Sequence, residues 1–254
     1  MFLLDGFSHQ QLATIAAAYF IAALVKGATG LGYSSTCLPI LTLAFGLKEA
    51  LPLVLIPSVS SNLVVMVSTP GFRASAQRFW PMVVSAAAAI FLGLWTLTQM
   101  RSADAAALLG AVLLLYVVFA LTNARFRLNE AKSRKFEPLI GAATGFINGL
   151  TGSQVMPVIP YLLSLDLPRE RFVHACNQSF TLSSAAMFIG LGATGLLTAQ
   201  DAVVSLYGLV LVALGVRLGQ GIGRRLAPQA FRTAVLCVLG ALGASLILRA
   251  AGHL

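Results

Sequence analysis

The chain alternates between long apolar runs and short polar or charged segments, and this alternation is its dominant pattern. A helix that crosses the hydrocarbon core of a bilayer needs about 20 mainly apolar residues, within a range of about 17–25. Six of the apolar runs have this length. We therefore predict spanning helices over residues 50–69, 80–99, 103–122, 172–192, 202–218 and 231–249.

Two apolar segments, 10–46 and 138–165, do not fit a single straight crossing. As one helix, 138–165 would measure about 42 Å against about 30 Å of hydrocarbon, yet two crossings need about 40 residues. The segment 10–46 is similarly awkward in length, and Lys26-Gly27 interrupts it. Each segment is predicted to form a broken or re-entrant helical hairpin that returns to its starting side.

The composition places the chain in a membrane. Hydrophobic residues make up 58% of the sequence and charged residues only 10%, whereas a soluble domain carries about 25%. The 254 residues leave no room for a separate soluble domain beside the apolar segments. The predicted fold class is all-α and polytopic, with the lipid bilayer as its surroundings.

The net charge of +9 comes from basic residues that concentrate in short loops. The positive-inside rule explains this placement better than a nucleic-acid partner does. If both hairpins return to their starting side and 125–135 is cytoplasmic, 13 basic residues lie inside and 3 outside, with Lys26 in the membrane. If both segments crossed once, the count would be 8 and 8. We expect a multi-pass protein of the plasma (inner) membrane with both termini outside.

The two halves of the chain present similar features in the same order. KGATG (26–30) matches NGLTG (148–152), and a proline-bearing apolar run follows each motif. The next predicted helix then carries a polar cluster, PSVSSN (57–62) or CNQSFTLSS (176–184).

With the orientation above, the first half starts outside and the second half starts inside. The order of features therefore predicts two inverted-topology repeats, each a glycine-broken hairpin plus three spanning helices. The repeats cover 1–124 and 138–254, and a basic cytoplasmic linker, 125–137, joins them.

A glycine-rich, proline-followed broken segment at the start of each half resembles the TauE/SafE family of sulfite and organosulfonate exporters. The resemblance covers nearly the whole chain in segment order. Here the glycine clusters are reduced to TGLGYSS (29–35) and TGSQVMP (151–157), whereas the family often has runs of adjacent glycines. The resemblance implies a plasma-membrane transporter for small sulfur-containing or carboxylate anions.

Irregular backbone in a membrane is tolerated where protein or a water-filled cavity satisfies its polar groups. In inverted-repeat transporters, two broken helices meet near the midplane and point free N–H groups at an anion. Glycines let backbone approach a ligand, and Ser, Thr and Gln side chains add donors. The predicted substrate-binding residues are Lys26, Gly27, Thr29, Gly30, Gly32, Ser34, Ser35, Asn62, Asn148, Gly149, Thr151, Gly152, Ser153, Gln154, Asn177 and Gln178.

Each of these assignments has a structural alternative. The glycines permit close packing of helices. Lys26 either attracts an anion or snorkels to the cytoplasmic interface. Asn62, Asn177 and Gln178 either line the cavity or form hydrogen bonds between helices.

The titratable residues offer little other chemistry. All eight carboxylates fall at loops or predicted helix ends, so no buried Asp or Glu is expected to relay protons. Three His and three Cys residues are scattered without CxxC or metal-ligand spacing, and the chain has no Walker A motif. We therefore expect no enzyme activity, no metal and no cofactor.

The predicted function is secondary transport of a small anion by alternating access, with the substrate where the two broken segments meet. Export is favoured by an inside-negative potential, and the family resemblance alone supplies sulfite or organosulfonate as the cargo. An anion channel and a non-transporting membrane scaffold are the alternatives. The sequence leaves open the exact substrate, the direction, the coupling ion and whether the protein forms a homo-oligomer.

Overall fold

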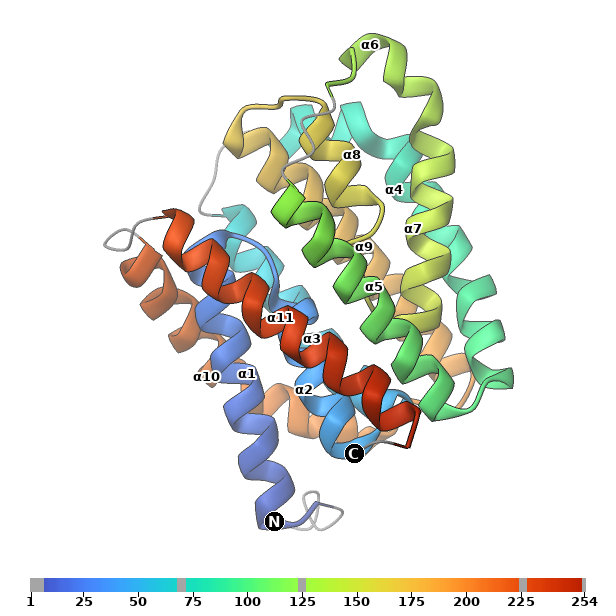
Figure 1. Ribbon diagram of the computed structural model, residues 1–254, viewed down its shortest axis with the longest axis vertical. Helices are drawn as coiled ribbons and strands as arrows, with labels where there is room; N and C mark the ends of the chain where they lie inside the picture. Colours follow the sequence, from blue (N-terminus) through green and yellow to red (C-terminus); the bar gives the residue numbers. More distant parts are fainter. Residues whose placement is uncertain (1–6, 68–71, 123–126, 224–227, 253–254) are drawn as a thin grey trace.

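The computed structural model describes residues 7–67, 72–122, 127–223 and 228–252, and this part of the chain is helical without any strand (Figure 1). The helices of the first half precede a short linker that contains α6 and the 3-10 turn η1. Their bounds are α1 His9–Thr29, α2 Tyr33–Phe45, α3 Leu47–Val67, α4 Phe72–Gln99, α5 Ser102–Thr122, α6 Glu130–Ser133, η1 Arg134–Phe136, α7 Glu137–Thr151, α8 Val158–Ser164, α9 Arg169–Ala193, α10 Ala199–Gly223 and α11 Pro228–Ala250.

Six of these helices are long and apolar enough to span a membrane: α1, α3, α4, α5, α10 and α11. The prediction of an all-α polytopic membrane protein is therefore confirmed. The membership of the set differs from the sequence prediction at two helices. The 21-residue α1 is long enough to cross by itself, although we expected it to be half of a hairpin.

The second difference is α9, which we predicted as an ordinary span over 172–192. It has 25 residues but is absent from the apolar set, because its middle carries polar residues. These side chains are hidden inside the protein and not exposed to lipid. The buried polar residues of α9 are His174, Asn177, Gln178, Ser179, Ser183 and Ser184.

Close pairs of helices hold the molecule together: α4 packs on α7, α1 on α10 and α5 on α11, while α3 and α9 pack against each other. Glycines lie at the contact in the first three of these pairs, and two examples show how close the helices come. A Cβ atom at Gly145 of α7 would lie 1.9 Å from the Ala86 carbonyl oxygen of α4. A Cβ atom at Gly219 of α10 would lie 2.2 Å from the Leu24 carbonyl oxygen of α1. Small residues at a helix contact let two helix backbones touch within a membrane.

The two ends of each broken segment have a feature in common. Phe7 before α1 and Phe45 at the end of α2 line the same pocket. Tyr161 of α8 donates a hydrogen bond to Glu137 at the start of α7, at 3.1 Å. In Figure 1, α1 begins and α11 ends toward the lower end of the view.

A proline in α3 leaves a backbone carbonyl free to bond with two other helices. Pro57 has no N–H to donate to the Leu53 carbonyl one turn earlier. Tyr19 of α1 and Ser205 of α10 donate their hydroxyl groups to this oxygen instead, the latter at 3.2 Å. The irregular helix α3 is thus anchored to the α1–α10 pair, and its backbone polar group is satisfied inside the protein.

Candidate functional site

The two helix breaks have the same backbone geometry. Gly30 ends α1 in the left-handed region with φ 82°, and its N–H donates to the Lys26 carbonyl at 2.8 Å. Gly152 ends α7 with φ 71°, and its N–H donates to the Asn148 carbonyl at 2.7 Å. Because glycine adopts positive φ without a steric penalty, it suits the end of a helix at both positions.

The threonine before each glycine forms the same hydrogen bonds at both helix breaks. Thr29 donates its hydroxyl to the Val25 carbonyl at 2.9 Å, and Thr151 donates to the Ile147 carbonyl at 2.7 Å. The hydroxyl oxygen of each threonine also accepts from the N–H two residues later, at 3.1 Å from Leu31 and 3.2 Å from Ser153. The two GxTG motifs therefore form one structural element that occurs twice.

The position of the first break differs from the sequence prediction. We expected Lys26-Gly27 to interrupt the segment, but α1 continues through both residues and ends at Thr29. Lys26 therefore belongs to the last turn of a regular helix. The break itself lies at Gly30–Gly32, and α2 starts at Tyr33 after Gly32, whose φ is 91°.

A small polar cavity lies between the first break and the loop of the second hairpin. Its volume is about 10 Å³, which is roughly the space that one water molecule needs. A sulfite-sized anion does not fit without an opening motion. The cavity is lined by Lys26, Gly32, Tyr33, Ser34, Ser35, Asn62, Gln154, Val155 and Phe180.

Lys26 is 1% exposed and its ammonium group lies inside the protein. Its Nζ atom donates to Oδ1 of Asn62 on α3 at 2.7 Å and to Oδ1 of Asn177 on α9 at 2.5 Å. The alternative that Lys26 snorkels to the interface is therefore wrong for this structure. One asparagine comes from the first half of the chain and the other from the second, so both halves contact this lysine.

The two asparagine side chains are fixed to different degrees. The Asn177 amide nitrogen donates to the Val173 carbonyl at 2.7 Å and to the Gly30 carbonyl at 3.3 Å, so its oxygen must face the lysine. The amide nitrogen of Asn62 is buried and has no hydrogen-bond partner among the described residues. It is a donor that a ligand in the cavity would satisfy.

No carboxylate in the described part of the chain forms an ion pair with Lys26. A buried charge is stable only when it is paired or well hydrogen-bonded, because burial removes its hydration. Here the observed partners are two neutral amide oxygens. Among the described residues, the site therefore holds a buried lysine without a protein counter-ion.

The structure brings seven predicted residues together. Six of them line the cavity, namely Lys26, Gly32, Ser34, Ser35, Asn62 and Gln154, and Asn177 contacts Lys26 directly. Ser34 pairs with Ser58 of α3 at 2.8 Å, and the Gln154 amide donates to Ser184 of α9 at 3.1 Å.

The other predicted residues lie outside the cavity lining. Thr29, Gly30, Thr151 and Gly152 form the two helix ends, and a Cβ atom at Gly27 would lie 2.1 Å from the Val216 carbonyl oxygen. A Cβ atom at Gly149 would lie 2.3 Å from the Ile90 carbonyl oxygen, so the packing alternative accounts for both glycines. Ser153 and Gln178 are buried nearby.

Asn148 occupies the position of Lys26 in the second half, but its surroundings differ. It is 1% exposed, and neither atom of its amide has a hydrogen-bond partner among the described residues. An unsatisfied buried amide is energetically costly. Asn148 is not among the residues that line the polar cavity.

Sequence reasoning missed some of the residues around the site. Tyr33, Val155 and Phe180 line the cavity. Tyr33 and Val155 stood inside the two glycine-rich stretches and Phe180 inside the polar cluster of α9, but their aromatic or aliphatic character suggested packing. Ser58, by contrast, belonged to the polar cluster that marked α3.

The expectation that no carboxylate is buried is also wrong. Glu137 at the start of α7 is 0% exposed and pairs with Arg78 of α4. Arg78 also bonds Glu130 at 3.2 Å, and Glu130 accepts from Arg171 of α9 at 3.1 Å. The burial of Glu137 was not evident from the sequence because this residue directly precedes the long apolar run 138–165 and so looks like a loop residue. The network ties the linker to α4, α7 and α9.

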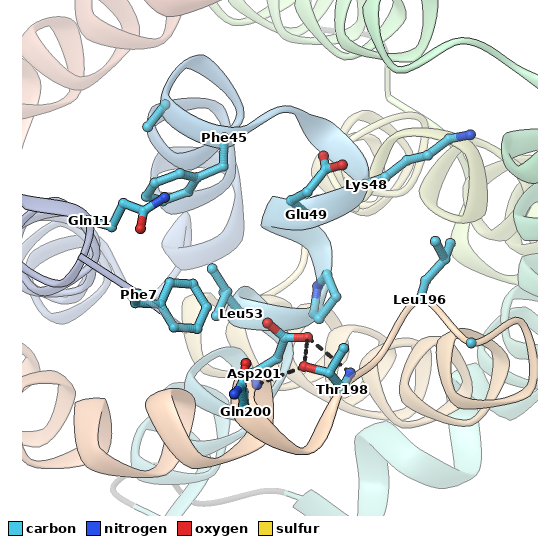
Figure 2. Close-up of a pocket in the computed structure, with 13 residues that line it drawn as sticks. Phe7, Gln11, Phe45, Lys48, Glu49, Leu53, Leu196, Thr198, Gln200 and Asp201 are labelled. Atoms are coloured by element: carbon cyan, nitrogen blue, oxygen red, sulfur yellow. Dashed lines mark hydrogen bonds between the residues drawn. The ribbon is translucent and has the colours of Figure 1, made fainter. Parts of the chain in front are cut away.

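A larger pocket of about 570 Å³ opens where α1 begins and α2 ends (Figure 2). Two of its charged side chains, Asp201 and Lys48, form hydrogen bonds within the protein. Asp201 accepts from the N–H and hydroxyl of Thr198 at 2.9 and 2.6 Å, which caps the start of α10. Lys48 donates to the Met100 carbonyl at 2.8 Å and extends away from Asp201 in Figure 2. This pocket therefore lacks the unpaired buried cation of the polar cavity.

Apolar helices around a buried polar cavity are the features of a multi-pass membrane transporter. A family model described as sulfite exporter TauE/SafE matches residues 15–246, so the chain belongs to the TauE/SafE family. This confirms the resemblance drawn from the two glycine motifs. Neither the comparison with curated proteins nor that with solved structures gives a match.

Proposed function

We propose that the protein exports small sulfur oxyanions, sulfite or organosulfonates, and binds them at the polar cavity beside Lys26. The observation that carries this proposal is a fully buried ammonium group whose observed partners are neutral amides. A bound anion would provide the missing counter-ion and would offset the desolvation of the lysine. Asn62, Ser34, Ser35 and Gln154 would supply donors to its oxygens.

The chain is organised as two inverted repeats, 1–124 and 138–254, about the linker 125–137. The matching hydrogen bonds at Gly30 and Gly152 support this organisation. The packing pattern supports it as well. Exchanging α1 with α7, α3 with α9 and α4 with α10 turns the α1–α10 contact into the α7–α4 contact, and it turns α4–α9 into α10–α3.

Transport follows from alternating access, in which one half rocks against the other around the site. The cavity of about 10 Å³ corresponds to a closed state that must open to admit the anion. Both hairpins re-enter from the side where they start. The positive-inside rule favours a cytoplasmic position for the basic segment 125–135 of a plasma-membrane protein, and the termini then face outside. The inside-negative potential then favours export by about 2.3 kcal/mol per charge per 100 mV.

Efflux of labelled sulfite and methanesulfonate from proteoliposomes tests the proposal, with and without an imposed potential. Lys26→Ala should abolish the flux, whereas Lys48→Ala is the matched control because Lys48 lies at the other pocket. Saturable flux that depends on Lys26 supports the transporter. Flux that does not saturate would identify a channel, and folded protein without any anion flux would point to a scaffold.

A further inference from the structure

We infer that the site selects anions with a single negative charge and carries them as a neutral pair with Lys26, discriminating against dianions. This rests on the proposed function and specifies its substrate class. The cavity lining offers a single side chain that can carry a positive charge, Lys26. No other described residue of the lining could compensate a second negative charge.

Every element packed around Lys26 presents uncharged groups to it. α3 presents Asn62. Residues 33–62, which cover α2 and α3 up to Asn62, contain only two charged side chains, Lys48 and Glu49, and both lie in the first turn of α3. α9 contributes Asn177, with Cys176 and the buried His174 as titratable neighbours. α10 packs Val216 against Gly27, while its Arg217 is exposed. Lys26 thus supplies the one formal charge of the cavity in the described residues.

The neutral donors suit the geometry of a sulfonate or hydrogensulfite group. Its oxygens can accept from the Lys26 ammonium, from the unpartnered amide nitrogen of Asn62 and from the hydroxyl groups of Ser34 and Ser35. These donors stabilise oxygen atoms without adding charge. A monoanion therefore gives a neutral, satisfied complex, whereas a dianion leaves a net negative charge inside the membrane, which is unfavourable.

The same charge count predicts which transport step senses voltage. With Lys26 charged, the loaded site is neutral and the empty site carries one positive charge. Exchange of one monoanion for another should therefore be insensitive to membrane potential. Net efflux should respond to it, because the empty carrier must return with its charge.

Isethionate and sulfoacetate make a matched pair for the test, because both are two-carbon sulfonates and only sulfoacetate carries a second, carboxylate charge. Proteoliposomes of the full chain would exchange labelled isethionate at neutral pH against either unlabelled compound. We expect sulfoacetate to compete on the order of tenfold more weakly or worse. Equal competition, or isethionate exchange that responds to potential, would overturn the inference while leaving the transporter intact.

A charge-adding variant gives an independent check. Asn62→Lys places a second ammonium at the cavity and should shift the preference toward sulfoacetate, measured as the ratio of the two competition constants. An unchanged ratio in folded, active protein would count against charge matching. Absence of any anion flux in the wild type would instead remove the proposed function itself, so the two failures are distinguishable.

Discussion

The two helix breaks share their backbone but not their chemistry. Each ends in a threonine and a left-handed glycine, with the same three hydrogen bonds around them. Four residues before the glycine, however, Lys26 is bound by two asparagines, while the buried amide of Asn148 has no hydrogen-bond partner among the described residues. The duplicated backbone therefore belongs to the fold. The chemical asymmetry lies in one side chain and its neighbours.

The largest expected effect comes from removing that asymmetry. Lys26→Met keeps the volume of the side chain and removes its charge, and we expect anion flux to fall by about 100-fold or more. Stability should be unchanged or higher, because replacing a buried charge with a well-packed apolar residue is often neutral or stabilising. Flux assays and thermal unfolding in detergent measure the two effects separately. Wild-type flux in Lys26→Met would remove Lys26 from the site.

The two glycines at the breaks should differ in their tolerance of alanine. At Gly152 a Cβ atom would meet the side chains of Leu51 and Leu38 at 2.3 and 2.5 Å, besides the cost of its positive φ. At Gly30 the nearest atoms, of Val173, lie at 3.5 Å. We expect a loss of unfolding free energy of about 2–4 kcal/mol for Gly152→Ala and about 1–2 kcal/mol for Gly30→Ala.

Thermal unfolding checks this ranking, with Gly221→Ala as the control, since a Cβ atom there meets nothing within 4 Å. Gly221 is helical, so alanine should leave the stability unchanged or raise it by up to about 1 kcal/mol. Equal losses at Gly30 and Gly152 would mean that backbone conformation alone, and not packing, distinguishes glycine at the breaks.

The next pair tests whether the glycines of the GxTG motifs have the same role in both halves. Gly27→Ala and Gly149→Ala each place a Cβ atom against a backbone carbonyl, at 2.1 and 2.3 Å. We expect similar destabilisation of about 1–3 kcal/mol for each, with little change in apparent substrate affinity in the protein that folds. A selective loss of affinity in Gly27→Ala would restore the substrate-binding interpretation for that residue.

Most of the fold could be predicted from the sequence, because charge-free runs of membrane length and loop charges are local signals. The exceptions have local causes too. The absence of Asp, Glu, Lys and Arg from residues 172–192 predicts an ordinary span for α9, whereas its uncharged polar residues mark it as an interior helix. Glu137 was missed because its burial depends on Arg78, 59 residues earlier.

The candidate site was predictable in part. The glycine breaks and the polar clusters of α3 and α9 identified the segments that converge, including Lys26, Asn62 and Asn177. What a sequence does not encode locally is which side of a helix meets which neighbour. Gly27 and Gly149 therefore looked like ligand positions, although their backbones contact Val216 and Ile90 of other helices.

The smallest expected effect concerns Asn148 and decides whether the second break has chemistry of its own. If its buried, unpartnered amide is only a remnant of the duplicated pattern, Asn148→Leu should raise the unfolding free energy by about 1 kcal/mol and leave flux unchanged. If the amide meets the anion in another state of the transport cycle, the same variant should lose flux despite its higher stability. Measuring both quantities separates these outcomes, and Asn148→Asp serves as the opposite control, because a buried negative charge there should lower the stability. A stabilised, active Asn148→Leu would show that one lysine in one half is sufficient for a site built on a twofold backbone.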